Sequence, residues 1–255
     1  MSAVALAAHQ FRYDQRVFWR RPSAVFFTVL FPLMFLFVFV GVFGNDEVEG
    51  TGVNTSTYYV PAIITLAVIS ATTQSLAIRL TQERDAGLLK RVRGTPLPPS
   101  AFIAGRVGNA AVVSVLMVLL VGGIGKVIWG VDLPTTTLPA LLLTLAVGVF
   151  AFCCLGFALC ALIPNEDAAP PITNVALFPL YFLSGIFIPE SEIPDGVLRV
   201  ADAFPIRHFF EAFFTAWDPS TTGAGFELGN LAVVLAWGLA ALGAALLAFR
   251  WEPRR

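Results

Sequence analysis

The sequence has very little charge where its apolar residues gather. Six long apolar runs contain no aspartate, glutamate or histidine, and only the third carries basic residues, Arg106 and Lys126, near its two ends. A carrier driven by protons or sodium ions usually needs an ionisable or strongly coordinating residue in such a run. An intramembrane hydrolase needs a nucleophile with a base in reach. These absences disfavour both classes, and we predict no catalytic residue in this chain.

Cysteines, histidines and phosphate-binding loops are also scarce. Cys153, Cys154 and Cys160 lie in one apolar run, at helical spacings that do not allow a disulfide. The two histidines are isolated, so we predict no metal site. Residues 122–127 (GGIGKV) lack the spacing of a Walker loop and the Ser or Thr that follows its lysine. Any energy for work must therefore come from a partner.

The sequence is rich in long apolar segments. Of its 255 residues, 57% are hydrophobic and 13% are charged, and the mean hydropathy is +0.78. This is far too apolar for a soluble domain, and the continuous runs lack the alternation of barrel strands. Because about 20 apolar residues cross a bilayer as a helix, we predict an all-α integral membrane protein with six transmembrane helices in a single domain, residues 1–255. The predicted spans are residues 22–44, 58–78, 102–128, 138–162, 171–188 and 230–249. The fifth is shorter and carries Pro179, Ser184 and Gly185, so we expect it to be broken or to lean on its neighbours.

The charges between the runs predict an orientation. Six spans place thirteen of the sixteen basic residues on one side of the membrane and eleven of the seventeen acids on the other. The positive-inside rule then puts both termini and the insert of residues 79–106 in the cytoplasm of a multi-pass cell (inner or plasma) membrane protein. The thirteen residues are Arg12, Arg16, Arg20, Arg21, Arg79, Arg84, Lys90, Arg91, Arg93, Arg106, Arg250, Arg254 and Arg255.

Residues 3–21 predict an amphipathic helix on the cytoplasmic membrane surface and not a secretory signal. Apolar residues that include Phe11 and Phe18 share one face, and Trp19 suits the membrane interface. The other face carries a basic residue every four positions: Arg12, Arg16 and Arg20. The alternative is a charged flank that only orients the first span.

The insert mixes acids, bases and a glycine before a Thr-Pro-Leu-Pro-Pro segment. We predict a short cytoplasmic helix over residues 82–93, which Gly94 and Pro96 end. Gly87 allows a partner backbone to approach closely, and the charged residues of the helix can orient docking. The alternative is a basic loop that merely obeys the positive-inside rule.

Two groups of motifs carry a resemblance. The first is ERDAGLLKR at residues 83–91, with GTPL at 94–97 and Gly105-Arg106. The second is LSGIFIP at residues 183–189, followed by the pairs Ile193-Pro194, Phe204-Pro205 and Glu211-Ala212. With the six-span layout and the basic N-terminal helix, nearly the whole chain resembles the type-2 membrane permeases of ATP-binding-cassette exporters, in particular the daunorubicin-resistance-like drug exporters.

The resemblance implies a homodimer, or a heterodimer with a similar permease, bound to two copies of a separately encoded ATP-binding subunit. ATP and Mg would be held by that subunit, with no cofactor in this chain. In that family a short cytoplasmic helix after the second span docks into a groove on the ATPase and transmits its closure. The residues to which we assign this coupling are Glu83, Arg84, Gly87, Leu88, Lys90 and Arg91.

Residues 189–227 are too long for a simple turn and rich in aromatic residues, which suggests short helices dipping into the outer leaflet. By resemblance, this segment between spans five and six re-enters the membrane and roofs the exit of the transport path. The alternative is a loop packed on the helix ends. The residues assigned to the exit region are Ser184, Gly185, Pro189, Pro205, Phe209 and Phe213.

We therefore predict the membrane subunit of an ATP-driven exporter that moves an amphipathic drug-like or lipid-like molecule outward. Membrane lipid is a further expected partner, and nucleic acid is not. One alternative is export of a polysaccharide or glycolipid. Another is a membrane scaffold or sensor that recruits a cytoplasmic partner without transport.

Overall fold

The computed structural model describes residues 3–48 and 52–249. Within these ranges the regular structure is helical, apart from one isolated β-bridge between Glu47 and Asn54. The prediction of an all-helical chain is thus confirmed. Four charges of the orientation argument, those of Glu49, Arg250, Arg254 and Arg255, lie outside the described residues.

A continuous helical rod lies at the centre of the bundle. It consists of α4 (Thr55–Ile69), the π-helical turn η2 (Ser70–Gln74) and α5 (Ser75–Asp85). Nearly all of α4 is buried, because it is apolar on every side. The hydroxyl of Thr65 donates a hydrogen bond of 2.9 Å to the carbonyl of Pro61 in the same helix. The helices packed around the rod are α3 (Phe31–Phe43), α7 (Pro99–Trp129), α8 (Leu138–Leu162) and α11 (Pro205–Trp217).

Four helices of the described ranges are long and apolar enough to cross a membrane: Thr55–Asp85, Pro99–Trp129, Leu138–Leu162 and Leu228–Ala248, the last being α12. Two more predicted spans, residues 22–44 and 171–188, also form apolar helices, but these differ in kind. The first is divided into α2 (Pro22–Val25), the π-helical turn η1 (Phe26–Leu30) and α3. The structure thus supports a multi-pass membrane protein with at least four long helices.

The fifth predicted span is shorter than the sequence suggested. Helix α9 (Ala169–Leu183) has 15 residues and ends five residues before position 188, where we had placed the end of the span. A helix of this length rises about 22 Å, less than the roughly 30 Å of a hydrocarbon core. Gly185 explains the early stop, since its φ of +86° lies in the left-handed region and turns the chain away.

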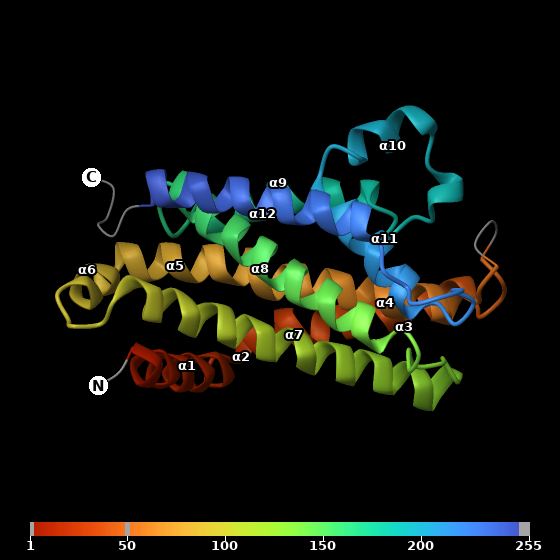
Figure 1. Ribbon diagram of the computed structural model, residues 1–255, viewed down its shortest axis with the longest axis horizontal. Helices are drawn as coiled ribbons and strands as arrows, with labels where there is room; N and C mark the ends of the chain where they lie inside the picture. Colours follow the sequence, from red (N-terminus) through yellow and green to blue (C-terminus); the bar gives the residue numbers. More distant parts are fainter. Residues whose placement is uncertain (1–2, 49–51, 250–255) are drawn as a thin grey trace.

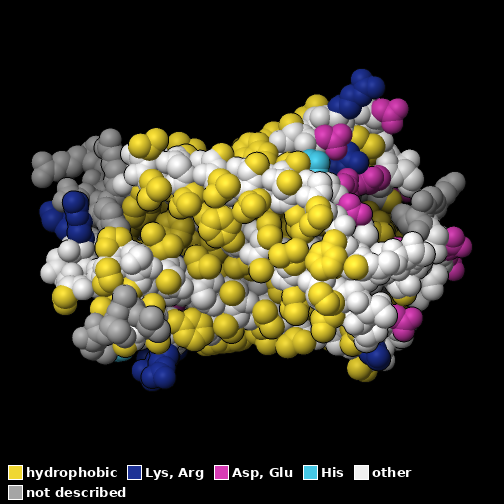
Figure 2. Space-filling view, in the orientation of Figure 1, with side chains coloured by type: hydrophobic (Ala, Val, Ile, Leu, Met, Phe, Trp, Pro, Cys, Tyr) yellow, Lys and Arg dark blue, Asp and Glu magenta, His cyan; other side chains and the backbone are white. Residues whose placement is uncertain are grey.

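The two ends of the bundle carry opposite charge (Figure 1, Figure 2). At one end lie α1 (Ala3–Trp19), α6 (Leu88–Arg93) and the end of α12; we call it the basic end. At the other lie α10 (Asp195–Ala201), α11 and the α3–α4 connection; we call it the acidic end. Lys and Arg side chains gather at the first and Asp and Glu at the second, with an apolar band between them.

Candidate functional site

The chain turns sharply between α5 and α6 at the basic end. The single helix predicted over residues 82–93 is wrong in this respect, because α5 ends at Asp85 and α6 begins at Leu88. Gly87 has a φ of +69°, a left-handed conformation that side chains rarely adopt. A Cβ added there would meet no atom within 4 Å. Glycine is therefore needed here for the backbone turn and not to make room within this chain.

The short helix α6 exposes one face at the surface and buries the other in the core. Leu89 is completely buried in the core, whereas Leu88 is 43% exposed and both Lys90 and Arg91 are exposed. A hollow of about 230 Å³ opens beside α6, lined by Val92, Arg93, Leu97, Pro99 and Phe102. Three of the predicted coupling residues thus lie on the surface, where a partner can reach them.

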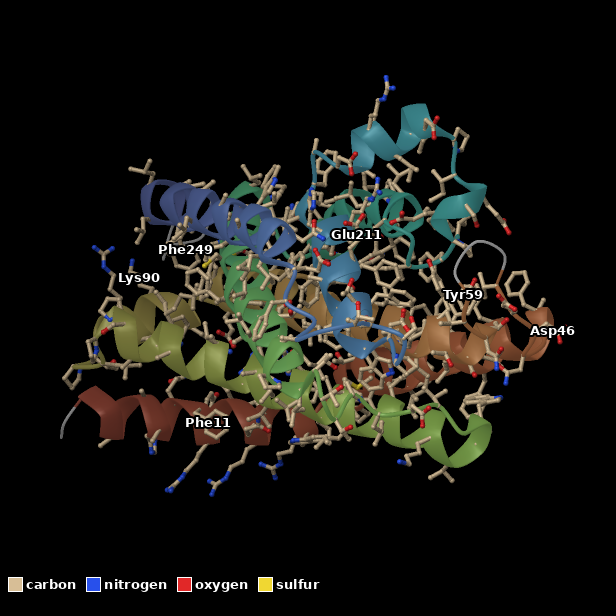
Figure 3. The ribbon with its side chains drawn as sticks, turned by 45° about the vertical axis from the view of Figure 1, so that its right-hand side comes forward. Phe11, Asp46, Tyr59, Lys90, Glu211 and Phe249 are labelled. Carbon is tan, nitrogen blue, oxygen red and sulfur yellow. The ribbon has the colours of Figure 1, made fainter. Side chains whose placement is uncertain are left out.

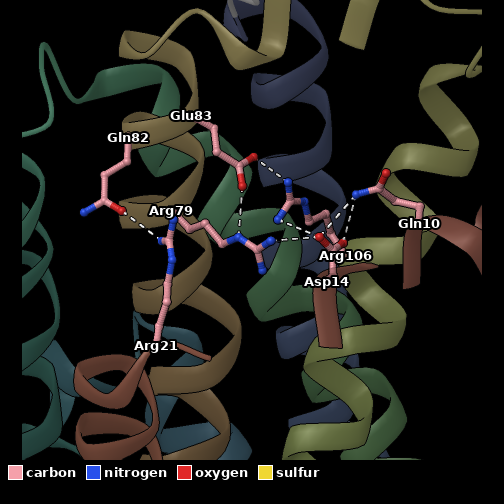
Figure 4. Close-up of polar contacts among 7 residues, drawn as sticks. All are labelled: Gln10, Asp14, Arg21, Arg79, Gln82, Glu83 and Arg106. Atoms are coloured by element: carbon pink, nitrogen blue, oxygen red, sulfur yellow. Dashed lines mark hydrogen bonds and ion pairs between the residues drawn. The ribbon is translucent and has the colours of Figure 1, made fainter. Parts of the chain in front are cut away.

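Glu83 belongs to a buried charge cluster, which we define as Asp14, Arg79, Glu83 and Arg106 (Figure 4). Arg79 lies 2.9 Å from Glu83 and 2.8 Å from Asp14. Arg106 pairs with Glu83 and lies 3.1 Å from Asp14, the latter contact being an ion pair without hydrogen-bond geometry. The side chains are between 0% and 14% exposed. Two acids and two arginines balance, and this balance makes the burial of four charges tolerable.

The charge cluster forms because α1 approaches α7 very closely. A Cβ on Gly105 would lie 2.6 Å from Cγ of Gln10, so only glycine allows this contact. The next residue, Arg106, then meets Asp14, and Gln10 donates hydrogen bonds at 3.2 Å to both carboxylate oxygens of Asp14. Burial raises the pKa of Asp14, against the opposing effect of Arg106 and Arg79. The Gly105-Arg106 pair of the first motif thus joins two helices.

Arg84 points the other way and holds the end of α8. Its guanidinium donates hydrogen bonds to the carbonyl oxygens of Cys160 at 3.2 Å, Ile163 at 3.0 Å and Pro164 at 2.9 Å. Those carbonyls would otherwise lack helical partners, and the positive charge suits the C-terminal end of a helix. Asp85 adds a second link, since one of its carboxylate oxygens accepts a hydrogen bond of 2.7 Å from the backbone of Glu166.

The structure therefore changes the way in which Glu83 and Arg84 would serve coupling. We had expected both to contact a partner directly, but Glu83 is 9% and Arg84 1% exposed, and both contact neighbouring helices of their own chain. Sequence reasoning also missed Asp14. The signal was present, because Asp14 lies three residues after Phe11 and four before Phe18, on the apolar face of α1.

At the acidic end, the aromatic face of α11 packs against the other helices of the bundle. Pro205 begins the helix, and Pro205, Phe209 and Phe213 are all buried. The ring of Phe209 lies 5.2 Å from that of Phe152 in α8 and also contacts Gly148, where an added Cβ would be 2.6 Å from Cζ of Phe209. Gly148 lies ten residues into α8, so this contact is about 15 Å from the start of that helix.

The turn after α9 meets α11 at the start of α4. The hydroxyl of Tyr58 donates a hydrogen bond of 2.6 Å to the carbonyl of Gly185, and the Tyr58 ring lies 5.8 Å from that of Phe210. Ser184 and Pro189 are buried beside this contact. The predicted exit-region residues thus come together from two separate segments, residues 184–189 and 205–213, which Figure 3 shows converging near the labelled Tyr59 and Glu211.

A second group of charges lies on the rim of this region. Arg207 lies 2.6 Å from Glu211, 2.8 Å from Asp202 and 3.3 Å from Glu190. Unlike the charge cluster at the basic end, its carboxylates are 28% to 50% exposed. Burial raises the pKa of Glu190, while Arg207 opposes that shift.

Among the described residues, no three His, Cys, Asp or Glu side chains are arranged to hold a metal ion. The three cysteines are buried and unbridged. The most developed sites of the described chain are a surface helix joined to buried ion pairs at one end and an aromatic helix at the other.

Residues 6–216 match the sequence profile of the ABC-2 type transporter family. The chain belongs to this family. Among curated proteins it is 23% identical over 218 residues to the transport permease YvfS of Bacillus subtilis (strain 168), an alignment that covers 86% of each chain. It is also 26% identical over 187 residues to the daunorubicin resistance ABC transporter permease protein DrrB1 of Streptomyces coeruleorubidus, covering 71% of this chain and 63% of the relative.

Membership of the ABC-2 type transporter family establishes the general role of the chain. Proteins of this family are the membrane components of ATP-binding-cassette transporters, which lack an ATPase site of their own and work with an ATP-binding subunit. The apolar helices described above agree with that role. The resemblance drawn from the two groups of motifs is thereby confirmed at the level of the family.

Proposed function

We propose that the chain is the permease subunit of an exporter that moves amphipathic drug-like or lipid-like molecules outward across the cell membrane. The basic end faces the cytoplasm with both termini, and the chain crosses the bilayer six times. A second permease protomer, in a homodimer, and two copies of an ATP-binding subunit that holds ATP and Mg complete the transporter.

The observation that carries this proposal is the attachment of α6. Its exposed residues Leu88, Lys90 and Arg91 form a small apolar and basic knob, suited to a groove on a partner. Behind the knob, α5 is bonded to α1 and α7 through the charge cluster and to the end of α8 through Arg84. A displacement of α6 therefore acts on four helices at once, without requiring Glu83 or Arg84 to touch the partner.

The acidic end supports the exit side of the proposal. The buried face of α11 contacts α4, α8 and α12, at a depth of about 15 Å along α8. We assign α10 and α11 to a re-entrant segment that covers the outer end of the transport path. The cargo class rests on the apolar side chains of the bundle and on the printed name of DrrB1, a daunorubicin resistance permease.

The knob can be tested without disturbing the core. Leu88→Glu and Arg91→Glu change exposed side chains, so both variants should insert and melt like the wild type. A negative charge that faces the partner, introduced at Leu88 or replacing the positive charge of Arg91, should weaken the ATP-binding subunit's hold by several kcal/mol and abolish export. Co-purification of that subunit and efflux of daunorubicin from whole cells measure the two effects.

Arg199→Glu provides the matched control, since Arg199 is an exposed arginine of α10 at the acidic end. It should leave both measurements unchanged. Full binding and full efflux in Leu88→Glu and Arg91→Glu would show that α6 is not the docking element. Binding of the subunit without movement of any cargo, in wild type and variants alike, would favour a scaffold over an exporter.

Orientation has its own test. A cysteine at the exposed position Ser220, at the acidic end, should react with an impermeant thiol reagent added to intact cells, whereas one at the exposed position Thr95 should react only after lysis. The three native cysteines are buried and contribute little background. Labelling of Thr95→Cys from outside would reverse the orientation and remove α6 from the cytoplasm.

A further inference from the structure

The outward face of α1 carries an arginine ridge, which we define as Arg12, Arg16 and Arg20. All three side chains are exposed, and they recur every four residues along the helix and the turn that ends it. Two amphipathic aromatic residues accompany them, Tyr13 at 55% and Trp19 at 49% exposure. Figure 3 shows nitrogen-tipped side chains that project from α1 sideways, away from the bundle.

No acid offsets this ridge within the described part of the chain. The one acid of α1, Asp14, points inward and is held by Arg79 and Arg106. None of the ridge residues forms an ion pair with a described residue. Like charges at a four-residue spacing on a helix destabilise each other, so the ridge favours an anionic ligand that neutralises it.

With the first span placed across the bilayer as proposed above, the ridge lies at the depth of lipid headgroups. From Pro22 to Phe43 the chain is helical through α2, η1 and α3, a rise of about 33 Å, which matches the hydrocarbon thickness. Arg20 therefore stands at the edge of the hydrocarbon, and Arg16 lies about 6 Å further along α1. Phe18 points inward, against Ala71 and Val113, so the ridge side of α1 faces away from the bundle.

We propose that the arginine ridge binds the phosphates of anionic phospholipids in the leaflet at the basic end. The planar guanidinium group donates paired hydrogen bonds to phosphate, and it keeps its charge at every physiological pH. Exposed tryptophan and tyrosine suit the same headgroup layer. The proposal rests on the membrane placement proposed above but not on transport.

The attachment of α1 gives this binding a consequence. Asp14 joins α1 to α5 and α7 through the charge cluster, and Gly105 allows close packing beside it. Lipid headgroups on one face of α1 and the charge cluster on the other thus hold the same helix. Anionic lipid would therefore fix the base against which α6 moves.

Trp19 provides a local probe. The full chain is reconstituted in phosphatidylcholine vesicles that contain, at equal mole fraction, either brominated phosphatidylglycerol or brominated phosphatidylcholine. Subtracting the signal of a Trp19→Phe variant isolates the fluorescence of Trp19. We expect brominated phosphatidylglycerol to quench Trp19 about two- to fivefold more strongly, given the attraction of basic residues to anionic membrane surfaces.

The triple variant Arg12→Gln, Arg16→Gln, Arg20→Gln should bring the quenching ratio close to one, because glutamine keeps the helix propensity but not the charge. Arg199→Gln, at the acidic end, should leave the ratio unchanged. Equal quenching by both lipids in the wild type, or an unchanged ratio in the triple variant, would overturn the proposal.

If the triple variant does not reconstitute, the quenching ratio of the wild type is measured at increasing salt concentration. A preference for brominated phosphatidylglycerol that persists undiminished at 1 M salt is not electrostatic and would overturn the proposal. Neither ATP nor cargo is present in this assay. Failure of export with the lipid preference intact would therefore count against the transport proposal alone.

Discussion

The basic and acidic ends of the bundle are held together by different forces. At the basic end, α1, α5 and α7 meet through a balanced set of buried ion pairs, and Arg84 fixes the end of α8 through three carbonyls. At the acidic end, α11 meets α4 and α8 through aromatic rings, and its charges stay on a partly exposed rim. Directional bonds join helices at one end, and ring packing joins them at the other.

This difference suits the proposed function, in which the ATP-binding subunit pushes on the basic end and the acidic end opens. Buried ion pairs lose much of their energy if their geometry changes, so helices joined in this way move as a unit. Ring contacts are less directional and tolerate sliding between offset arrangements. The contrast predicts that removing charge destabilises the basic end most, whereas added volume disturbs the acidic end.

The largest expected effect comes from Arg106→Met. It leaves Asp14 and Glu83 buried with only Arg79 between them, and breaking a buried pair in this way typically costs about 3–5 kcal/mol. The matching change at the acidic end, Arg207→Met, removes an arginine whose carboxylates are partly solvated, so it should cost about 1 kcal/mol or less. Thermal unfolding in detergent, followed by size-exclusion chromatography, measures both.

A double variant separates charge balance from shape. Arg106→Met combined with Glu83→Gln restores one acid to one arginine and should recover part of the lost stability, with an interaction energy of about 0.5–3 kcal/mol. Equal losses for Arg106→Met and Arg207→Met would show that the two ends are not held differently. Failure of Glu83→Gln to improve Arg106→Met would point to lost packing, including the contact of Arg106 with the ring of Phe102.

Sequence reasoning reached the membrane class, the helical fold and the family. These depend on long apolar runs and on local motifs, which can be recognised without knowing how the helices pack against one another. It did not reach the interior of the basic end. One of the two acids that Arg79 contacts, Asp14, lies 65 residues away in α1, and the carbonyls held by Arg84 lie 76 to 80 residues away. A charged motif looks the same in a sequence whether it faces solvent or another helix.

At the acidic end, the sequence identified the segments that meet but not the points at which their helices end. The motifs around Gly185 and Pro205 marked the two segments that meet. Ser184 and Gly185 marked the fifth span as one that is broken or leans on its neighbours, but the position of its end was not foreseen, because residues 184–188 are as apolar as the helix before them. Only the left-handed backbone of Gly185 shows that the chain turns there, and hydropathy carries no information on that.

An intermediate effect is expected from Gly148→Ala, which adds volume where α11 touches α8. Its Cβ would lie 2.6 Å from Cζ of Phe209, a ring that is fully buried and cannot swing away, so the variant should lose about 1–3 kcal/mol. Gly243→Ala is the control, since a Cβ there meets nothing within 4 Å and should raise helix stability slightly. Adding Phe209→Leu should relieve Gly148→Ala. Normal stability of Gly148→Ala would place α11 further from α8 than the structure does.

The smallest expected effect is a pH dependence at the acidic rim. Burial raises the pKa of Glu190 above its usual 4.5, with Glu211 and Asp202 adding to the rise and Arg207 opposing it. The folded protein therefore binds this proton more tightly than the unfolded chain does. The contribution of Glu190 to stability is then fully present below pH 4.5 and is lost as the pH rises from 4.5 through the raised pKa, the reverse of an acid stabilised by an ion pair.

Glu190→Gln should remove this slope and leave the melting temperature flatter between those two limits. Glu192→Gln, an exposed neighbour in the same short helix, should keep the wild-type slope. The side chain of Glu190 is 39% exposed, so water and salt screen its interactions and the change in melting temperature will be small. Melting curves at low and high salt for the three proteins decide the matter. A wild-type slope that survives Glu190→Gln would assign the titration to another group, and a rise in stability with pH that depends on Glu190 would mean that Arg207 dominates over burial.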